Sequence, residues 1–405
     1  MITGAGAFTA AGRTAADLWS GVQAGASLAR WNDQGEEFEG NRFATCSAPP
    51  TGPEIDALHR LGRMDRSVQM AGVAAWEAWQ DAALPRDLLH PERVAIFAGT
   101  SRGPLESVML AHRRVLARKR MLPTLAPNST ISCLSGALSN LFAVRGPCLT
   151  ISAACASGAA AIGMAAQQIA AGFLDVAVAG GAEAPLNSLV LSQLESAGVL
   201  ASHSDPQSAC RPFDSERNGT VLGEGAAFLI LESVSRARQR GARIRARLAG
   251  WAVTSDGGGR TGISRENEGL ERAMRGAVEM AGMSFDEIDY INAHGTGTRL
   301  NDRLEARAIA TAAKGRAIPT SSTKPVTGHC MGAASAIEAV ISILAIENQC
   351  LPPSANCHSQ DPDCPVKLVT GQPWKQKVRA VLSNSAGFWG NTAALVFTTP
   401  GKDES

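Results

Sequence analysis

The sequence predicts a layered α/β protein built from two similar halves. Three observations lead to this prediction. Glycine and alanine are plentiful while charged residues make up only 19% of the 405 positions, which suits closely packed layers rather than a disordered chain. Strand-like apolar runs alternate with helix-like segments. A short motif that opens one helix of small residues recurs in the second half, and a chain of this length can bury one large core or two moderate ones.

The first half alternates between predicted strands and helices. We expect strands at residues 2–6, 93–99, 147–152, 175–181 and 226–232, and helices at residues 17–24, 60–83, 105–120 and 153–171. Several of these strands are short apolar runs, as expected for strands buried on both faces. Residues 32–54 are polar and contain proline and glycine, which predicts a surface loop.

The second half repeats this alternation. A short basic stretch at residues 236–245 is interpreted as the junction. Strands are expected at residues 244–253, 289–293, 317–322, 379–383 and 394–397, and helices at residues 266–281, 304–313 and 330–348. We therefore divide the chain into an N-terminal half, residues 1–240, and a C-terminal half, residues 241–405.

Composition argues against several classes of protein. The net charge of +1 provides no general attraction to nucleic acid or to a membrane surface. We find no run of about eighteen apolar residues that would predict a spanning helix, and no basic region followed by an apolar core that would predict a secretory signal. The nine cysteines form no CxxC pair, so neither a disulfide framework nor a metal site is expected. We predict a cytoplasmic protein with reduced thiols.

Cys155 lies where a predicted strand turns into a helix of small residues. Unpaired backbone N–H groups and the positive end of the helix dipole gather at such a point. A thiol there is expected to ionise more easily, and the backbone donors can face an oxyanion. A lone buried cysteine is also a common inert core residue, so its interpretation as a nucleophile depends on the rest of the chain.

The turn at Cys155 has a counterpart in the second half. Residues 155–160 read Cys-Ala-Ser-Gly-Ala-Ala, and residues 329–334 read His-Cys-Met-Gly-Ala-Ala. Each places a reactive side chain three residues before Gly-Ala-Ala and opens a helix rich in small residues. A duplicated half would explain the match, and packing about a pseudo-twofold axis would then bring Cys155 and His329 together. The alternative is chance similarity between two alanine-rich helices.

Further segments are expected to converge on the same place. His294 follows directly after a predicted strand, and strand ends are where ligands bind in open α/β sheets. Lys324 and His329 share one loop, and the glycine-bearing loop at residues 384–390 can offer backbone N–H groups. Two histidines beside a candidate nucleophile indicate catalysis rather than a structural role.

The sequence resembles the β-ketoacyl-acyl carrier protein synthases, the elongating condensing enzymes of fatty acid and polyketide synthesis, over nearly the whole chain. The motifs that carry the resemblance are Ala-Cys-Ala-Ser-Gly at Cys155, His-Gly-Thr-Gly-Thr at His294, Thr-Lys-Pro-Val-Thr-Gly-His at 323–329, Gly-Gly-Ala-Glu at 180–183 and Arg-Pro-Phe-Asp at 211–214. The resemblance implies a thiolase-like fold with duplicated halves in a five-layer α-β-α-β-α arrangement, usually dimeric. One cysteine with two histidines is similar to the elongating subtype, whereas the initiating subtype pairs its cysteine with one histidine and an asparagine.

The resemblance also implies a mechanism. The thiolate of Cys155 attacks an acyl thioester carried on the phosphopantetheine of acyl carrier protein, while backbone N–H groups of Cys155 and Phe388 hold the oxyanion. His294 and His329 stabilise the enolate that forms when malonyl-carrier protein loses carbon dioxide. That carbanion attacks the acyl group and gives a β-ketoacyl product, so no bound cofactor and no metal are expected. Further implied roles are an orienting ion pair for Lys324 and Glu338, and pantetheine contacts for Thr296 and Thr298.

The division of labour between these residues follows from the position of Cys155. Because the helix start alone can lower the pKa of the Cys155 thiol, we expect both histidines to serve the malonyl half-reaction more than acyl transfer.

Three positions depart from the usual family pattern near the acyl pocket. Ala386 and Trp389 lie in Asn-Ser-Ala-Gly-Phe-Trp-Gly, where Asn-Ser-Phe-Gly-Phe-Gly-Gly is common. Ser101 stands near a place that a bulky aliphatic residue often takes. A pocket with two trimmed side chains is expected to accept a bulkier or stiffer acyl group. This favours a specialised polyketide or polyene pathway over housekeeping fatty acid elongation.

A basic cluster supplies a candidate docking surface. Arg60, Arg63 and Arg66 lie at the start of the helix predicted at 60–83. On an otherwise neutral chain they are expected to help dock an acidic acyl carrier protein, and the alternative is a solvated face. The resemblance further implies a dimer, either of two copies or with a related synthase-like subunit. The net charge of +1 predicts no nucleic acid or membrane partner.

Two other functions compete with this interpretation. A thiolase acting on coenzyme A thioesters would carry a second catalytic cysteine in a C-terminal Cys-x-Gly turn, and the last cysteine, Cys364, is far from any such turn. A non-catalytic, chain-length-determining partner would lack the nucleophile, whereas Cys155 and both histidines are present. The sequence leaves open the acyl chain length, the carrier protein and the pathway.

Overall fold

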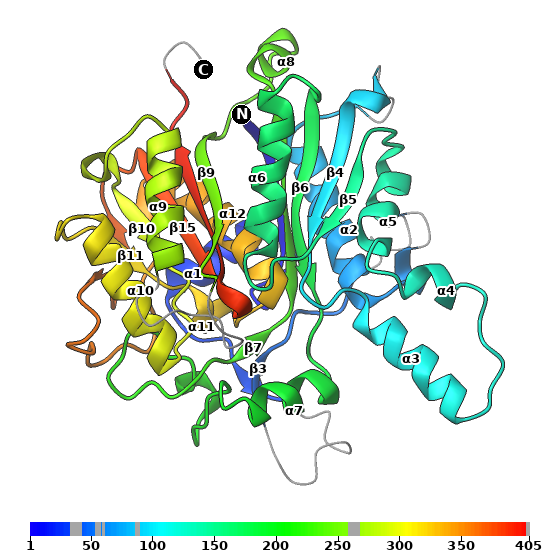
Figure 1. Cartoon of the computed structure of the whole chain (residues 1–405), viewed down its shortest axis with the longest axis horizontal. Coiled ribbons are helices and arrows are strands. Elements are labelled where there is room, and N and C mark those ends of the chain that lie inside the picture. The colour runs from blue at the N-terminus through cyan, green and yellow to red at the C-terminus, as the bar shows by residue number, and fades with distance from the viewer. Residues whose placement is uncertain (33–42, 53–57, 59–60, 86–89, 258–267, 402–405) are drawn as a thin grey trace.

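The computed structural model describes residues 1–32, 43–52, 58, 61–85, 90–257 and 268–401. Two large sheets organise the chain (Figure 1). The first has the order β1 (Ile2–Phe8), β8 (Gly225–Glu232), β6 (Val176–Glu183), β4 (Val94–Gly99), β5 (Cys148–Ile151). The second has the order β13 (Lys367–Leu368), β11 (Pro319–Ser321), β10 (Tyr290–Asn292), β15 (Ala380–Ala386), β16 (Asn391–Thr398), β9 (Arg247–Ser255).

The two sheets share one pattern of strand pairing. In the first, β6, β4 and β5 are parallel, and β8 and β1 continue the sheet as antiparallel strands. In the second, β15, β10 and β11 are parallel, and β16 and β9 continue it in the same antiparallel sense. All five strands of the first sheet therefore have counterparts of the same order and direction in the second, which β13 extends by one strand, and the prediction of duplicated halves is confirmed.

Helices complete five layers. Between the sheets lie α6 (Ser157–Ala170) and α12 (Ala334–Asn348). The outer face of the first sheet is covered by α2 (Arg66–Asp81) and α5 (Cys133–Phe142), and α9 (Glu268–Met280) and α10 (Arg299–Ala312) lie outside the second (Figure 1). The expected α-β-α-β-α arrangement is thus confirmed.

The central layer explains the helices of small residues. A Cβ on Gly158 of α6 would lie only 2.8 Å from the backbone nitrogen of Ala336 in α12, so the two helices touch through residues without bulk. Residues 334–346 are all buried, because sheets cover α12 on both sides. The segment Met331–Asn348 is long and apolar enough to span a membrane, yet 89% of it is buried inside the protein, as befits a core helix.

The remaining elements fill the edges. They are α1 (Ala15–Ala24), β2 (Arg30–Trp31), β3 (Ala44–Cys46), α3 (Leu105–Leu116), α4 (Leu125–Asn128), α7 (Ser188–Ser196), β7 (Leu222–Gly223), α8 (Val234–Gln239), α11 (Lys324–Thr327), β12 (Cys350–Leu351) and β14 (Trp374–Lys375). The sequence analysis missed α5 and α7. It also placed helix starts imprecisely: α2 begins at Arg66, where Asp65 caps it, and α10 begins at Arg299 rather than at 304.

Candidate active site

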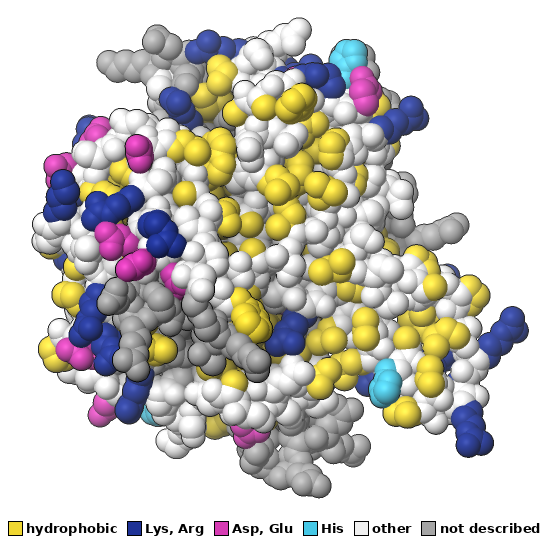
Figure 2. All heavy atoms as spheres, viewed as in Figure 1, with side chains coloured by type: hydrophobic (Ala, Val, Ile, Leu, Met, Phe, Trp, Pro, Cys, Tyr) yellow, Lys and Arg dark blue, Asp and Glu magenta, His cyan; other side chains and the backbone are white. Residues whose placement is uncertain are grey.

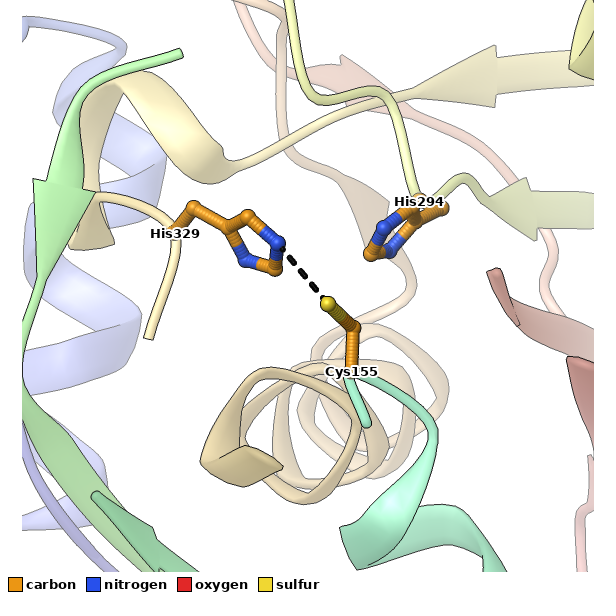
Figure 3. Close-up of side chains that lie close together, drawn as sticks. All are labelled: Cys155, His294 and His329. Carbon is orange, nitrogen blue, oxygen red and sulfur yellow. Dashed lines mark hydrogen bonds between the residues drawn. The ribbon is translucent and has the colours of Figure 1, made fainter. Parts of the chain in front are cut away.

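Cys155 stands at the junction of β5 and α6, as predicted. The residue before it, Ala154, has a φ of +50°, a left-handed conformation that costs energy for a residue with a Cβ. This turn directs the Cys155 thiol away from the helix and toward the second half of the chain (Figure 3). The start of α6 after Cys155 is fixed by Ser157, whose hydroxyl accepts the N–H of Ala153 at 2.9 Å.

The two halves bring one thiol and two imidazoles together (Figure 3). Cys155 Sγ lies 3.2 Å from His329 Nε2. One ring nitrogen of each histidine and the sulfur all lie within 4.8 Å of one another, and the rings meet edge to face with centroids 5.2 Å apart. His294 is 1% exposed, and Cys155 and His329 are each 8% exposed. The convergence expected from the repeated motif therefore occurs in the fold.

Lys324 orients His294 from behind. Its ammonium donates to the carboxylate of Glu338 and to the backbone carbonyl oxygen of His294, and it lies 3.3 Å from His294 Nδ1. An ammonium can only donate, so Nδ1 accepts and the hydrogen of the neutral ring resides on Nε2. Lys324 and Glu338 thus form the expected ion pair. His294 can donate a hydrogen bond through Nε2–H.

Burial controls the charges at this centre. It lowers the pKa of His294 well below its usual value and the pKa of His329 to about 3, with the Lys324 charge acting in the same direction. Both rings are therefore neutral near pH 7.

The pKa of Cys155 contradicts the expectation of easy ionisation. Burial raises it to about 12, and the positive charge of Lys324 only partly offsets this. Desolvation of the thiolate inside the protein is the largest cause of this rise. Cys155 is consequently a thiol at rest, and the His329 nitrogen 3.2 Å away is placed to take its proton.

The loop after β15 lies directly over the nucleophile. A Cβ on Gly387 would lie 2.8 Å from the backbone nitrogen of Cys155, so only glycine permits this approach. Phe388 follows immediately and lines the cavity with Cys155. The close approach of Gly387 therefore brings this loop against the backbone of Cys155, and the oxyanion hole formed by Cys155 and Phe388 stays a prediction.

A cavity of about 670 Å³ opens onto these side chains. Thr296, Thr298 and Ala386 line it, and so do Leu194 of α7 and Met331. The hydroxyls of Thr296 and Thr298 lie 2.9 Å apart. The expected pantetheine contacts and one expected pocket residue thus face the cavity.

Two other expected pocket residues lie elsewhere. Of the residues that the structure describes, neither Ser101 nor Trp389 is among those lining this cavity. The Ser101 hydroxyl donates to the buried carboxylate of Glu183 at 2.8 Å. Trp389 is 61% exposed and has a φ of +65°, so its ring points outward while its backbone shapes the loop that carries Phe388.

The basic cluster divides into different environments. Arg60 lies outside the described residues. Arg66 donates twice to the carboxylate of Glu224, at 2.7 and 2.8 Å, and to the carbonyl oxygen of Ala48. Its charge is therefore engaged inside the chain, whereas the Arg63 side chain is exposed, and its docking role stays a prediction.

Sequence reasoning assigned no role to two carboxylates that shape the site, although Glu183 ends one of the motifs that carry the resemblance. Glu305 of α10 accepts the backbone N–H groups of His294 and Gly295, both at 2.7 Å, and the side-chain amide of Asn384. Glu183, at the end of β6, holds the loop after β4. The available signal was a buried acidic residue on an otherwise apolar strand, and a glutamate eleven residues after His294 on the next helix.

The chain matches two family models in succession. One is the Beta-ketoacyl synthase, N-terminal domain, over residues 1–237, and the other is the Beta-ketoacyl synthase, C-terminal domain, over residues 245–358. The chain belongs to the β-ketoacyl synthase family. Members of this family are condensing acyltransferases, and the paired cysteine and histidines lie where the two domains meet in this synthase.

Known proteins similar to this synthase come from more than one pathway. A putative polyketide beta-ketoacyl synthase 1 of Streptomyces halstedii is 35% identical, over 99% of this chain and 98% of its own length. A 3-oxoacyl-[acyl-carrier-protein] synthase 2 of Staphylococcus aureus is 35% identical over 83% of this chain and 84% of its own. The solved structure of the ishigamide ketosynthase/chain length factor has a TM-score of 0.90 and 34% identity, covering 99% of this chain and 98% of that one.

Proposed function

We propose that Cys155 is the nucleophile of a decarboxylative condensation in which His294 and His329 divide the proton chemistry. The observation that carries this proposal is the 3.2 Å contact between Cys155 Sγ and His329 Nε2, in a buried centre that opens onto a cavity. A nucleophile and a base in such contact are the arrangement that acyl transfer needs.

In the first half-reaction an acyl group moves to Cys155. The Cys155 thiol gives its proton to His329 Nε2, and the sulfur attacks the thioester carbonyl. The backbone N–H groups of Cys155 and Phe388 face the oxyanion. The carrier thiolate then leaves, takes the proton from His329, and an acyl-Cys155 thioester remains.

In the second half-reaction a malonyl thioester enters the same cavity. Its carboxylate leaves as carbon dioxide, and the electron pair of the broken C–C bond forms an enolate. His294 Nε2–H donates to the enolate oxygen, with His329 beside it. The enolate carbon attacks the acyl-Cys155 carbonyl, a C–C bond forms, and the C–S bond breaks, which releases a β-ketoacyl product. Cys155 leaves as a thiolate and takes up one proton from water to return to the resting thiol.

The assignment of Cys155 is tested by intact mass after incubation with an acyl-carrier protein. Cys155→Ala should form no acyl-enzyme and retain its fold, because alanine suits this turn of small residues. Cys330→Ala removes a buried thiol one residue from His329 and is the matched control, which should still be acylated. An adduct on the Cys155→Ala chain would contradict the proposal, and so would a wild-type chain that is never acylated, as expected of a non-catalytic partner.

Acyl carrier protein is the proposed donor of both substrates. The support is the family itself and a relative whose name specifies acyl-carrier-protein substrates. We further propose that the chain works as a dimer, with a second copy or with a related subunit. Its β5 is an edge strand, Leu149 on it is 47% exposed, and Met164 and Phe173 nearby along α6 and its end are 39% and 67% exposed. Figure 2 shows hydrophobic side chains gathered on this face.

The acyl group is proposed to belong to a specialised polyketide or polyene. Ala386 lines the cavity in place of the aromatic residue common in the family, and it leaves room for a stiff chain. One methylene of fit changes specificity by about 1–3 kcal/mol, so Ala386→Phe should shift preference toward slimmer saturated chains without abolishing turnover. Competition between saturated and polyunsaturated acyl-carrier proteins measures this. A preference for saturated chains that is the same in the wild type and in Ala386→Phe would contradict the proposal.

We place the enzyme in the cytoplasm. Its nine cysteines are all free thiols, as expected in a reducing compartment.

A further inference from the structure

Glu183 is a fully buried carboxylate that receives five hydrogen bonds. It is the last residue of β6 and is 0% exposed. Its donors are the hydroxyl of Thr100 (3.0 Å), the backbone N–H and hydroxyl of Ser101 (2.7 and 2.8 Å), the backbone N–H of Arg102 (3.0 Å) and the backbone N–H of Gly332 (3.0 Å). Burial raises the pKa of the Glu183 carboxyl, and the hydrogen bonds from Ser101, Arg102 and Thr100 act in the opposite direction by stabilising the anion.

From Glu183 the contacts lead to the Cys155 turn. Thr100, which donates to Glu183, has its carbonyl oxygen 3.3 Å from the hydroxyl of Ser157. The same hydroxyl lies 2.6 Å from the carbonyl oxygen of Ala154 and accepts the N–H of Ala153. The two residues that precede Cys155 are therefore held against the loop that Glu183 fixes.

In the other direction the contacts lead to His329. Gly332 comes three residues after His329 and is the one donor to Glu183 named above that belongs to the C-terminal half. A Cβ on Gly332 would lie 2.4 Å from the backbone nitrogen of Ser101 and 2.7 Å from Glu183 Oε2. The turn after His329 is thus seated directly on the first half, and no larger residue fits there without displacing the backbone.

We propose that Glu183 is a positioning residue, which fixes the distance between Cys155 and His329 by bonding the loops of both halves at once. This inference rests on the proposed roles of Cys155 and His329. A carboxylate suits the task because both of its oxygens accept and neither donates. An isosteric amide would turn an NH₂ group toward N–H donors. Glu183→Gln therefore replaces attraction by repulsion, without changing volume, at the joint between the halves, by which we mean the contact of Glu183 with residues 100–102 and Gly332.

Three variants test the proposal. Glu183→Gln breaks the joint from the first half, and Gly332→Ala pushes it open from the second without changing charge. Glu77→Gln is the matched control, because Glu77 of α2 also accepts backbone N–H groups, from Ala7 and Ala15 at 2.8 and 2.9 Å, but does not line the cavity. Single-turnover acylation of Cys155 by acyl-carrier protein, alkylation of Cys155 by iodoacetamide and Tm are measured on each.

A misplacement of about 1 Å can cost about 100-fold in rate, so Glu183→Gln and Gly332→Ala should each slow acylation of Cys155 by about tenfold or more. The control Glu77→Gln should lose a similar amount of Tm without slowing acylation. The double variant should be little slower than the worse single variant, since both open one joint. Additive losses would overturn the proposal, as would acylation by Glu183→Gln as fast as by Glu77→Gln.

Alkylation separates positioning from charge. Glu183 raises the pKa of Cys155 through its negative charge, so a purely electrostatic role predicts faster alkylation in Glu183→Gln, and that result would overturn the proposal. If Glu183→Gln does not fold, Ser101→Ala removes one donor and should give a smaller loss in the same direction, and unchanged acylation in both Ser101→Ala and Gly332→Ala would be decisive against it. A wild-type chain that is not acylated on Cys155 would instead refute the proposed function.

Discussion

The loop after β4 and the loop after β10 occupy equivalent places in the two halves, and each is held by a buried carboxylate. Glu183 holds the first loop from the neighbouring strand β6 and reaches across to Gly332 in the other half. Glu305 holds the second loop from the following helix, α10, and its further donors, Asn384 and Asn301, come from the same half. The first carboxylate joins the halves, whereas the second fixes one histidine within its own half.

This difference shows that duplication of the fold does not by itself fix the positions of the catalytic side chains. The two halves share strand order, but the chemistry is unequal: the first supplies a thiol at a helix start, and the second supplies two imidazoles and an ammonium. Identical scaffolds cannot set the distance between unlike groups, and each loop is held by its own buried carboxyl group. Since a buried carboxylate is costly unless donors surround it, both are cradled by backbone N–H groups.

The largest expected effect separates the two histidines. His329 contacts the Cys155 thiol, whose pKa is about 12, so His329→Ala should slow acylation by about 10²–10⁴-fold, the usual contribution of a general base. His294→Ala should slow malonyl-carrier protein decarboxylation while acylation largely survives. This revises the expectation that both histidines serve mainly the malonyl step. Mass spectrometry of acyl-Cys155 and measurement of released carbon dioxide decide it, and equal loss of acylation in both variants would contradict it.

A moderate effect is expected at the second carboxylate. Glu305→Gln should loosen the loop that carries His294 and slow decarboxylation more than acylation, the reverse of Glu183→Gln. A similar slowing of both steps by both variants would erase the contrast between the two loops. Glu77→Gln, remote from both loops, should slow neither step.

Glu305 also gives a prediction for pH. Burial raises its pKa to about 7, above its unfolded value of about 4.3. A raised pKa means that the native state holds the proton more tightly, so this contribution to stability is present in acid and is lost as pH rises through about 7. Tm should fall less between pH 6 and 8 in Glu305→Gln than in the wild type. Burial also raises the pKa of Glu77 to about 7, so Glu77→Gln should likewise reduce the fall of Tm with pH. An unchanged dependence of Tm on pH in both variants would contradict the prediction.

The smallest effect concerns how the carrier approaches the first half. Arg63→Glu should weaken carrier binding at low salt by less than about tenfold, and the difference should vanish at high salt because exposed charges are screened. Arg66→Glu should instead lower Tm, because it leaves the buried carboxylate of Glu224 facing another anion. Binding by anisotropy at two salt concentrations, with Tm of both variants, checks this. Salt-independent loss in Arg63→Glu would argue for a structural role.

Much of this protein was determined by the sequence alone. The alternation of elements and the match between residues 155–160 and 329–334 predicted duplicated halves and a meeting of Cys155 with His329, because a pseudo-twofold axis between the halves makes the starts of equivalent helices face each other. The resemblance of motifs identified Lys324 and Glu338 as a pair and Thr296 as a cavity residue, which the structure places accordingly. Local patterns suffice where spacing along the chain fixes spacing in the fold.

Other properties were decided only by the tertiary structure. The pKa of Cys155 depends on how completely the surrounding layers exclude water, and no local motif measures that, so the expected ionisation was wrong. Ser101 does not line the cavity, because its hydroxyl donates to the carboxylate of Glu183, more than eighty residues away along the chain. Arg66 does not belong to an exposed basic cluster, because it forms an ion pair with the buried carboxylate of Glu224. In each case a long-range partner set the side chain's environment, and such partners become neighbours only when the sheets assemble.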